Sequence, residues 1–220
     1  MTRRDREPPV MPTMTDLVFD LDGQRLPPTW RDELAQALQA ALPELSSVQV
    51  HPLRLVPSGE ELLLPRRARL RLRLPHHHID ELQNSLMARE LNVGSERLRL
   101  THPRRRPIDT APTLHTDILV LDIATDDPDT DASYVEAMFE AMLRAELVAI
   151  DPMLDDVPLI LGKARVIQTR ASPCGFWHGF PVVIHDLTPN QSLRLQERGL
   201  GAWPWLGLGV LVPHKTITGL

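Results

Sequence analysis

The chain has 220 residues, 42% of them hydrophobic and 24% charged, and its formal net charge is −5. This composition excludes a wholly disordered chain, and no apolar run approaches the roughly 18 residues of a membrane span, so an integral membrane protein is also excluded. The single cysteine, Cys174, excludes a disulfide framework and a cysteine-based zinc finger, and it favours a cytoplasmic location.

The predicted elements begin after a charged, proline-rich segment at residues 1–13, which is typical of a flexible tail. Hydrophobic periodicity then predicts the order strand, helix, strand, strand, helix, strand. The strands are expected at residues 16–21, 48–56, 62–74 and 91–100, and the helices at 30–42 and 79–89. Residues 101–113 contain three prolines and no periodicity, so they are predicted to be a linker.

The same order of elements repeats after this linker. Strands are expected at residues 114–124, 157–170, 179–186 and 206–212, and helices at 131–147 and 188–198. The last helix has the clearest start, with Thr188 as the cap, Pro189 at the first position and Gln191 completing a capping box. The sequence therefore predicts an α+β protein of two tandem ferredoxin-like domains, residues 14–100 and 114–220.

The charges are segregated along the chain. Residues 54–106 hold twelve basic and six acidic side chains, whereas residues 107–160 hold one basic and thirteen acidic. Alternation in the third and fourth strands places arginines on one face. Because a guanidinium can bind two phosphate oxygens at once, this face is predicted to bind RNA. The arginines assigned to this face are Arg67, Arg69, Arg71, Arg73, Arg97 and Arg99, and Arg54 of the second strand is also assigned to RNA binding. The alternative is a solvated sheet face that the acidic block balances.

A glycine-rich motif follows the last predicted helix. Two Gly-hydrophobic-Gly triplets, separated by five residues, contain Gly199, Gly201, Gly207 and Gly209. Backbone amides at glycines can approach phosphate oxygens closely, although the spacing matches neither the Rossmann fingerprint nor the P-loop. The alternative is a helix stop followed by a β-bulge. In the spacer, Trp203 and Trp205 would either stack on unpaired bases or fill the core beneath the loop.

The motif resembles that of the CRISPR repeat-cleaving endoribonucleases of the RAMP superfamily, the sixth Cas protein family. The flanking segments SLRLQERGLG (192–201) and VLVPHK (210–215) are similar too, as are QVHPLRL (49–55) and LLLPRRARLRLRLP (62–75). The resemblance covers roughly residues 15–215 and is closest to the branch found in MYXAN-type systems. The spacer departs from the family because it contains no lysine or arginine, which argues against phosphate binding by a spacer side chain.

The resemblance implies metal-independent cleavage of precursor CRISPR RNA into guide units. In that reaction the 2′-hydroxyl attacks the adjacent phosphate and leaves a 2′,3′-cyclic phosphate and a 5′-hydroxyl. The family's catalytic histidine lies near the first helix, where His51 falls, and imidazole can transfer protons near neutral pH. His214 and Lys215 are the reserve acid–base or phosphate partners, or else solvated residues.

The implied partners are CRISPR repeat RNA, both as the precursor and as a guide that can stay bound, and other CRISPR effector subunits. No cofactor, metal or membrane is expected. The three consecutive histidines at residues 76–78 cannot converge on one ion from a helix.

Two other functions stay open at this stage. A non-catalytic RAMP subunit would hold guide RNA in an effector complex, and the missing spacer cation supports it. A tandem ferredoxin-like protein unrelated to RNA would bind a small molecule or a protein, and the acidic block at residues 109–156 would then be the surface of interest.

Overall fold

The computed structural model describes residues 10–40, 47–123, 132–170 and 176–214. The first half contains β1 (Met14–Asp22), α1 (Trp30–Gln39), β3 (Gln49–Val50), β6 (Arg69–Pro75), α2 (Ile79–Met87) and β8 (Glu96–Arg106). The second half contains β9 (Leu114–Val120), α3 (Ala132–Ile150), β10 (Leu159–Leu161), β12 (Phe176–Ile184), α4 (Pro189–Arg198) and β13 (Val212–Pro213). The prediction of an α+β fold with two tandem ferredoxin-like units is confirmed.

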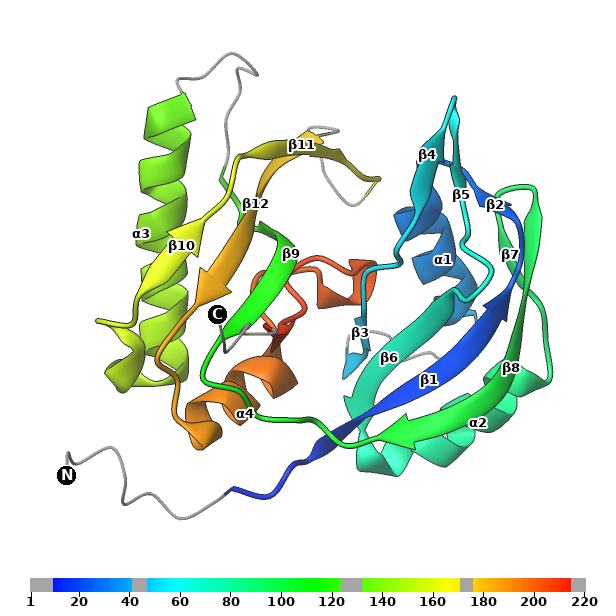
Figure 1. The fold of residues 1–220 in the computed structure, drawn as a ribbon, viewed down its shortest axis with the longest axis horizontal. Coiled ribbons are helices and arrows are strands. Elements are labelled where there is room, and N and C mark those ends of the chain that lie inside the picture. The colour runs from blue at the N-terminus through cyan, green and yellow to red at the C-terminus, as the bar shows by residue number, and fades with distance from the viewer. Residues whose placement is uncertain (1–9, 41–46, 124–131, 171–175, 215–220) are drawn as a thin grey trace, which may run out of the picture.

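The two larger sheets have the same strand order. The first sheet runs β3-β6-β1-β8 and ends in the short strand β7 (Leu91–Val93), and the second runs β10-β12-β9-β13, with β11 (Arg165–Gln168) also paired to β12. Counted within each half, both orders are second, third, first and fourth strand, as in the ferredoxin-like unit. Figure 1 shows the two sheets side by side, with α1 and α2 on one and α3 and α4 on the other.

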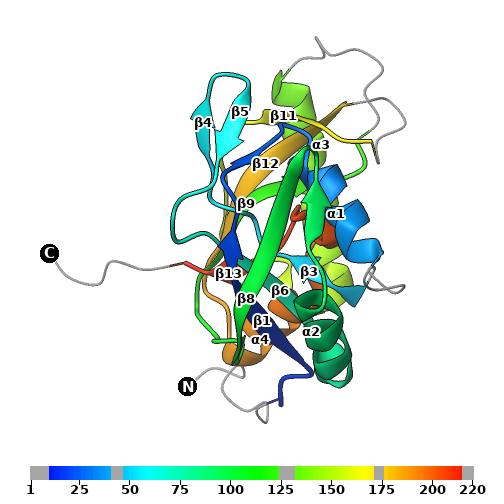
Figure 2. The same ribbon diagram turned by 90° about the vertical axis from the view of Figure 1, so that its right-hand side faces the viewer.

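A small third sheet extends from the first half. It consists of β2 (Arg25–Leu26), β5 (Glu61–Leu63) and β4 (Val56–Ser58), in that order. Its β4–β5 hairpin projects from the rest of the first half (Figure 2). The sequence predicted one strand over 48–56, but Pro52 has no N–H for a ladder, and β3 and β4 are separate strands that pair with different partners.

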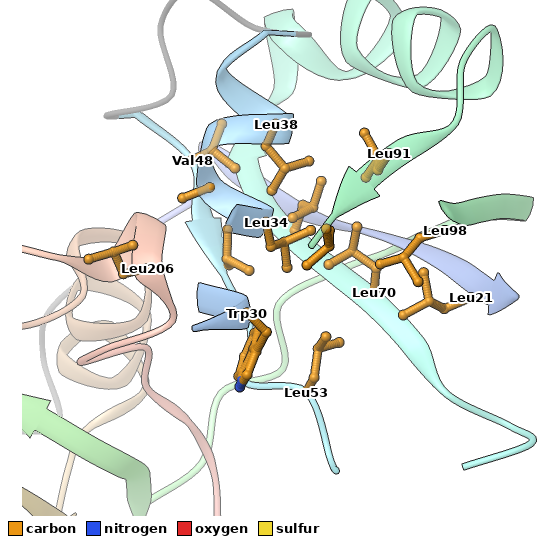
Figure 3. Packing of buried hydrophobic residues seen from close by; sticks show 14 of the residues in the cluster. Leu21, Trp30, Leu34, Leu38, Val48, Leu53, Leu70, Leu91, Leu98 and Leu206 are labelled. Carbon is orange, nitrogen blue, oxygen red and sulfur yellow. The ribbon is translucent and has the colours of Figure 1, made fainter. Parts of the chain in front are cut away.

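The hydrophobic core consists of two main clusters, one of which spans both halves. Leu34 and Leu38 of α1 pack in the first cluster with Leu70 of β6, and Leu206 from the second half belongs to the same cluster (Figure 3). Its other second-half members are Ile118, Val120, Trp177 and Leu208. The second cluster lies between α3 and its sheet, where the Phe139 and Phe180 rings are 4.3 Å apart. The first half therefore completes its core with side chains of the second.

Residues 101–106, which the sequence assigned to a linker, continue β8 as a strand. They pair with β1 as far as Asp16 and Arg106, and the register shifts between Val18 and Asp20. The prolines do not prevent this strand, because a proline can occupy an edge or irregular position of a ladder without a hydrogen bond.

Residues 10–13, assigned to the flexible tail, are attached to α4. The backbone N–H of Val10 donates to Asn190 Oδ1, and those of Thr13 and Met14 donate to Glu197 Oε1. Residues 1–9 lie outside the described residues. The first strand is therefore anchored at its start by the last helix of the second half.

The predicted strand over 206–212 is also shorter in the structure. The 3₁₀ turn η5 (Pro204–Leu206) precedes Gly207, and only Val212 and Pro213 form β13. Gly207 and Gly209 have φ values of 76° and 79°, which lie outside the range of regular strands.

The start of α4 agrees with its sequence signal. Thr188 accepts a hydrogen bond from the Gln191 N–H, and the Gln191 side chain accepts one from the Thr188 N–H at 3.0 Å. The predicted capping box is confirmed.

Replacing Thr188 by alanine should lower the free energy of unfolding by about 1 kcal/mol, because the substitution removes the acceptor for an otherwise unpaired helix N–H. Urea denaturation followed by circular dichroism measures the change. Thr188→Ser keeps the oxygen and is the matched control. Equal denaturation midpoints for wild type and Thr188→Ala would contradict the role of this cap.

Candidate functional site

A fully buried guanidinium, that of Arg73 in β6, lies where the two halves meet. Its Nε donates to Asp16 Oδ1 at 2.9 Å, and its Nη1 donates to the carbonyl oxygens of Gln196 and Leu211, both at 2.9 Å. The sequence predicted Arg73 on an exposed RNA-binding face, and this is wrong. Alternation placed it on the polar face of β6 as expected, but α4 and the segment before β13 cover that part of the face.

Asp16 in β1 is the shared acceptor of this buried network. Its carboxylate is fully buried and accepts hydrogen bonds from Arg71, Arg73 and the His51 ring. Burial alone would raise the pKa of Asp16, but the hydrogen bond with His51 and the charges of Arg73 and Arg71 hold that pKa well below its usual range. Asp16 is therefore ionised at neutral pH.

His51 follows β3 and is held by Asp16. The ring is 7% exposed, and its Nε2 lies 3.3 Å from Asp16 Oδ1. Burial lowers the pKa of His51 to about 4, although the hydrogen bond with Asp16 opposes the shift. The ring is therefore neutral at pH 7, and a neutral imidazole that donates to Asp16 through Nε2 offers Nδ1 as its proton acceptor.

A cleft of about 1250 Å³ opens beside His51 between the two halves. Its first-half wall carries basic side chains, and its second-half wall carries two histidines and an aspartate. The polar side chains that line it are His51, Arg54, Arg67, Arg69, Arg71, Arg106, Asp109, His115, Asp117 and His214. The structure therefore brings together His51, His214 and four of the arginines that the sequence assigned to RNA.

Two of the assigned arginines lie elsewhere. Arg97 and Arg99 are exposed on β8, which is separated from β6 by β1, and neither lines the cleft. Arg106, at the end of the same strand, does line it. Arg106 was not predicted as a site residue, because the prolines of residues 101–113 indicate a linker and not a strand.

The second wall contains a pair of histidines, of which only His214 was predicted from the sequence as a site residue. The rings of His115 in β9 and His214 after β13 meet edge to face, with centroids 5.2 Å apart. Burial lowers the pKa of His115, and the charge of Asp117 opposes this. Alternation along β9 places His115 and Asp117 on the same face, and this pattern could have indicated His115 as a site residue. Lys215 lies outside the described residues.

The amides of the glycine motif are used inside the protein, contrary to the expectation that they bind phosphate. All four glycines have φ values between 69° and 79°. The N–H groups of Gly199, Gly207 and Gly209 donate to the carbonyls of Leu195, Pro204 and Ile118. The Gly201 N–H donates to the Glu146 carboxylate at 2.9 Å, and burial raises the pKa of Glu146. The motif therefore connects α4, β9 and α3.

The two spacer tryptophans join the core instead of standing free for base stacking. Trp203 and Trp205 are partly buried and pack against the cluster that both halves share. The Trp203 and Trp177 rings meet edge to face with centroids 4.3 Å apart. The structure thus favours the core-packing alternative for both.

Arg31 of α1 fixes the motif from the side of the first half, and no sequence pattern predicts this contact. Its Nη1 donates to the carbonyls of Leu206 at 3.1 Å and Gly207 at 3.3 Å, and its guanidinium lies 4.5 Å from the Trp30 ring centroid. The glycine segment is therefore held between α1 and β9 (Figure 1).

Within the described ranges, no three His, Cys, Asp or Glu side chains lie close enough together to hold a metal ion. The three consecutive histidines form the 3₁₀ turn η3 (His76–His78). In the same part of the chain, no helix combines the length and the apolar character that crossing a membrane requires.

Comparison with known proteins gives one family and a consistent fold. The family model described as Cas6 Crispr matches residues 15–216. The CRISPR-associated endonuclease Cas6 of Myxococcus xanthus (strain DK1622) is 28% identical over 201 residues, which cover 90% of this chain and 80% of that protein. These matches confirm the resemblance found in the sequence.

Solved structures agree in fold at low identity. One described as an RAMP protein binding different RNA substrates has a TM-score of 0.67 and 11% identity, covering 91% of this chain and 100% of that one. Another, from the characterization of a Cas6-related gene of Pyrococcus furiosus, has a TM-score of 0.64 and 12% identity, covering 92% of this chain and 100% of that one.

The buried histidine makes stability depend on pH. Because the folded-state pKa of His51 is about 4 and the unfolded value is near 6.5, the folded state binds fewer protons, and stability is lost as the pH falls between these values. Between pH 7 and pH 4.5 this residue should lower the free energy of unfolding by about 2 kcal/mol. Urea denaturation at both pH values measures the loss. His51→Gln should lose correspondingly less, and an identical loss in both proteins would contradict burial of a neutral ring.

The glycine motif should fail sterically when a side chain is added. A Cβ at Gly209 would lie 1.8 Å from the Leu200 carbonyl oxygen. A strained φ alone costs roughly 1–3 kcal/mol, so Gly209→Ala should lower the free energy of unfolding by well over that amount. Gly59 has a φ of 62° and open space around its Cβ position, so Gly59→Ala is the matched control for the φ cost. Thermal unfolding compares the two. A similar, small effect at both positions would contradict the packing of the motif.

Proposed function

The chain belongs to the Cas6 family, and we propose that it is an endoribonuclease that binds CRISPR repeat RNA and cuts the precursor into guide units. The name of the Myxococcus xanthus relative, a CRISPR-associated endonuclease, supports this activity. The guide produced by the cut would stay bound to this protein, and the two would pass together to other effector subunits.

The observation that carries the proposal is the cleft with an arginine wall and a neutral histidine at one edge. Arg54, Arg67 and Arg69 are exposed there, and Arg71 is partly exposed while it also contacts Asp16. Each guanidinium can bind two phosphate oxygens at once, and an A-form stem is recognised mainly through its backbone and shape. This wall suits the phosphate backbone of a repeat hairpin.

His51 would act as the general base. Its neutral ring can accept the proton of the 2′-hydroxyl at Nδ1 while Nε2 stays with Asp16, and the buried carboxylate would stabilise the imidazolium that forms. The 2′-oxygen then attacks the adjacent phosphate and the 5′-oxygen leaves, giving a 2′,3′-cyclic phosphate and a 5′-hydroxyl. Proton transfer of this kind needs no metal.

Asp16 is a positioning residue in this scheme. It does not face RNA, because its carboxylate is fully buried beneath His51, Arg71 and Arg73. Its contribution is to fix the ring of His51 and the nitrogen through which that ring reacts.

Cleavage of the cognate repeat RNA by purified protein in EDTA tests the proposal. His51→Ala should slow single-turnover cleavage by about 100-fold or more and leave RNA affinity nearly unchanged, because a general base contributes that much to such steps. His77→Ala removes an exposed histidine outside the cleft and is the matched control.

A requirement for magnesium, or equal rates for His51→Ala and wild type, would refute this mechanism. Salt-dependent binding of the repeat by a wild-type protein that never yields a cut product would instead support the non-catalytic RAMP subunit.

A further inference from the structure

The proposed reaction needs a second proton-transfer group. When the bond between phosphorus and the 5′-oxygen breaks, the oxygen leaves as an unstable alkoxide unless an acid protonates it. The arginines of the first wall cannot serve, because a guanidinium does not release its proton in proteins. His51 is poorly placed for it, because the attacking 2′-oxygen and the leaving 5′-oxygen lie on opposite sides of phosphorus in an in-line displacement.

The second wall holds an imidazole close to the His51 network. Arg73, which contacts Asp16, donates to the Leu211 carbonyl, and the next residue, Val212, is the strand partner of His115. The charge of Arg54, three residues after His51, also acts on His115. His115 and His51 also line the same cleft, and the contacts through Leu211 and Val212 link His115 to the network around His51.

We propose that His115 is the general acid that protonates the 5′-oxygen, which gives the cleft one catalytic histidine from each half. This inference rests on the proposed function and adds a residue to it. His115 Nε2 lies 3.9 Å from Asp117 Oδ1, beyond hydrogen-bond distance, and this nearby carboxylate favours protonation of the ring.

The step balances without any co-reactant. His51 Nδ1 takes the 2′-hydroxyl proton, the 2′-oxygen forms a bond to phosphorus, the bond from phosphorus to the 5′-oxygen breaks, and His115 gives its proton to that oxygen. The products are the 2′,3′-cyclic phosphate and the 5′-hydroxyl. Each histidine then returns to its starting state by exchanging one proton with water.

The groups around His115 determine how readily it carries that proton. Burial lowers its pKa, Asp117 and the Val212 backbone raise it, and His214 and Arg54 lower it. A bound phosphate adds a negative charge to these neighbours and favours the protonated ring. More of the His115 rings would therefore carry a proton to donate when RNA occupies the cleft.

An RNA in which sulfur replaces the bridging 5′-oxygen at the cut site tests the assignment. A thiolate leaves without protonation, so an enzyme that lacks its general acid should still cut this RNA. The variants are His115→Gln, His115→Asn, His214→Gln and His51→Gln, with His77→Gln as the control outside the cleft. For each protein the measured quantity is the ratio of the two cleavage rates, sulfur over oxygen, which cancels differences in folded fraction.

His115→Gln and His115→Asn should cut the oxygen RNA about 100-fold or more slowly than wild type and cut the sulfur RNA at close to the wild-type rate. His51→Gln should lose both rates and keep the wild-type ratio. If the sulfur RNA restored cleavage by His214→Gln but not by the His115 variants, the assignment to His115 would be overturned. A wild-type ratio of the two rates in the His115 variants would overturn it as well. Both of these results leave the proposed function intact, whereas a wild-type protein that cuts neither RNA refutes it.

Discussion

The ion pair between Arg73 and Asp16 is the interaction on which the rest of the molecule depends. One guanidinium binds a carboxylate of the first half and two backbone carbonyls of the second. Removing one partner of such a pair costs about 3–5 kcal/mol, because the other charge is left buried and uncompensated. The same carboxylate orients His51. The position of the halves and the state of the candidate base therefore have a common physical origin.

The glycine motif contributes to this arrangement as a packing device. Its positive φ values let the chain turn twice in a few residues, and its missing side chains let it approach β9. Arg31 holds it from α1, and Glu146 holds it from α3. A motif that marks the family in sequence can thus be explained here by close contact between the halves.

Local signals predicted the repeated element order, the capping box of α4 and the side of β6 on which its arginines lie, because periodicity and capping depend on neighbouring residues. These local patterns do not predict contacts between residues that are distant in sequence. Alternation says which face carries Arg73, but not that α4 covers that face. The pairing of Val212 with His115 depends on the sheet order. The acceptors for the Gly209 and Gly201 amides, Ile118 and Glu146, are far away in sequence.

The anchored N-terminal strand and the shared core have one more consequence. Because Glu197 fixes the start of β1 and Leu206 fills the core of the other half, the two walls cannot separate without exposing apolar surface and a buried charge. Discrimination between repeats would then depend on how much the nucleic acid itself must distort to enter a groove of constant width. An ill-fitting hairpin would be rejected during association, and the difference between good and poor substrates would lie in the rate of capture.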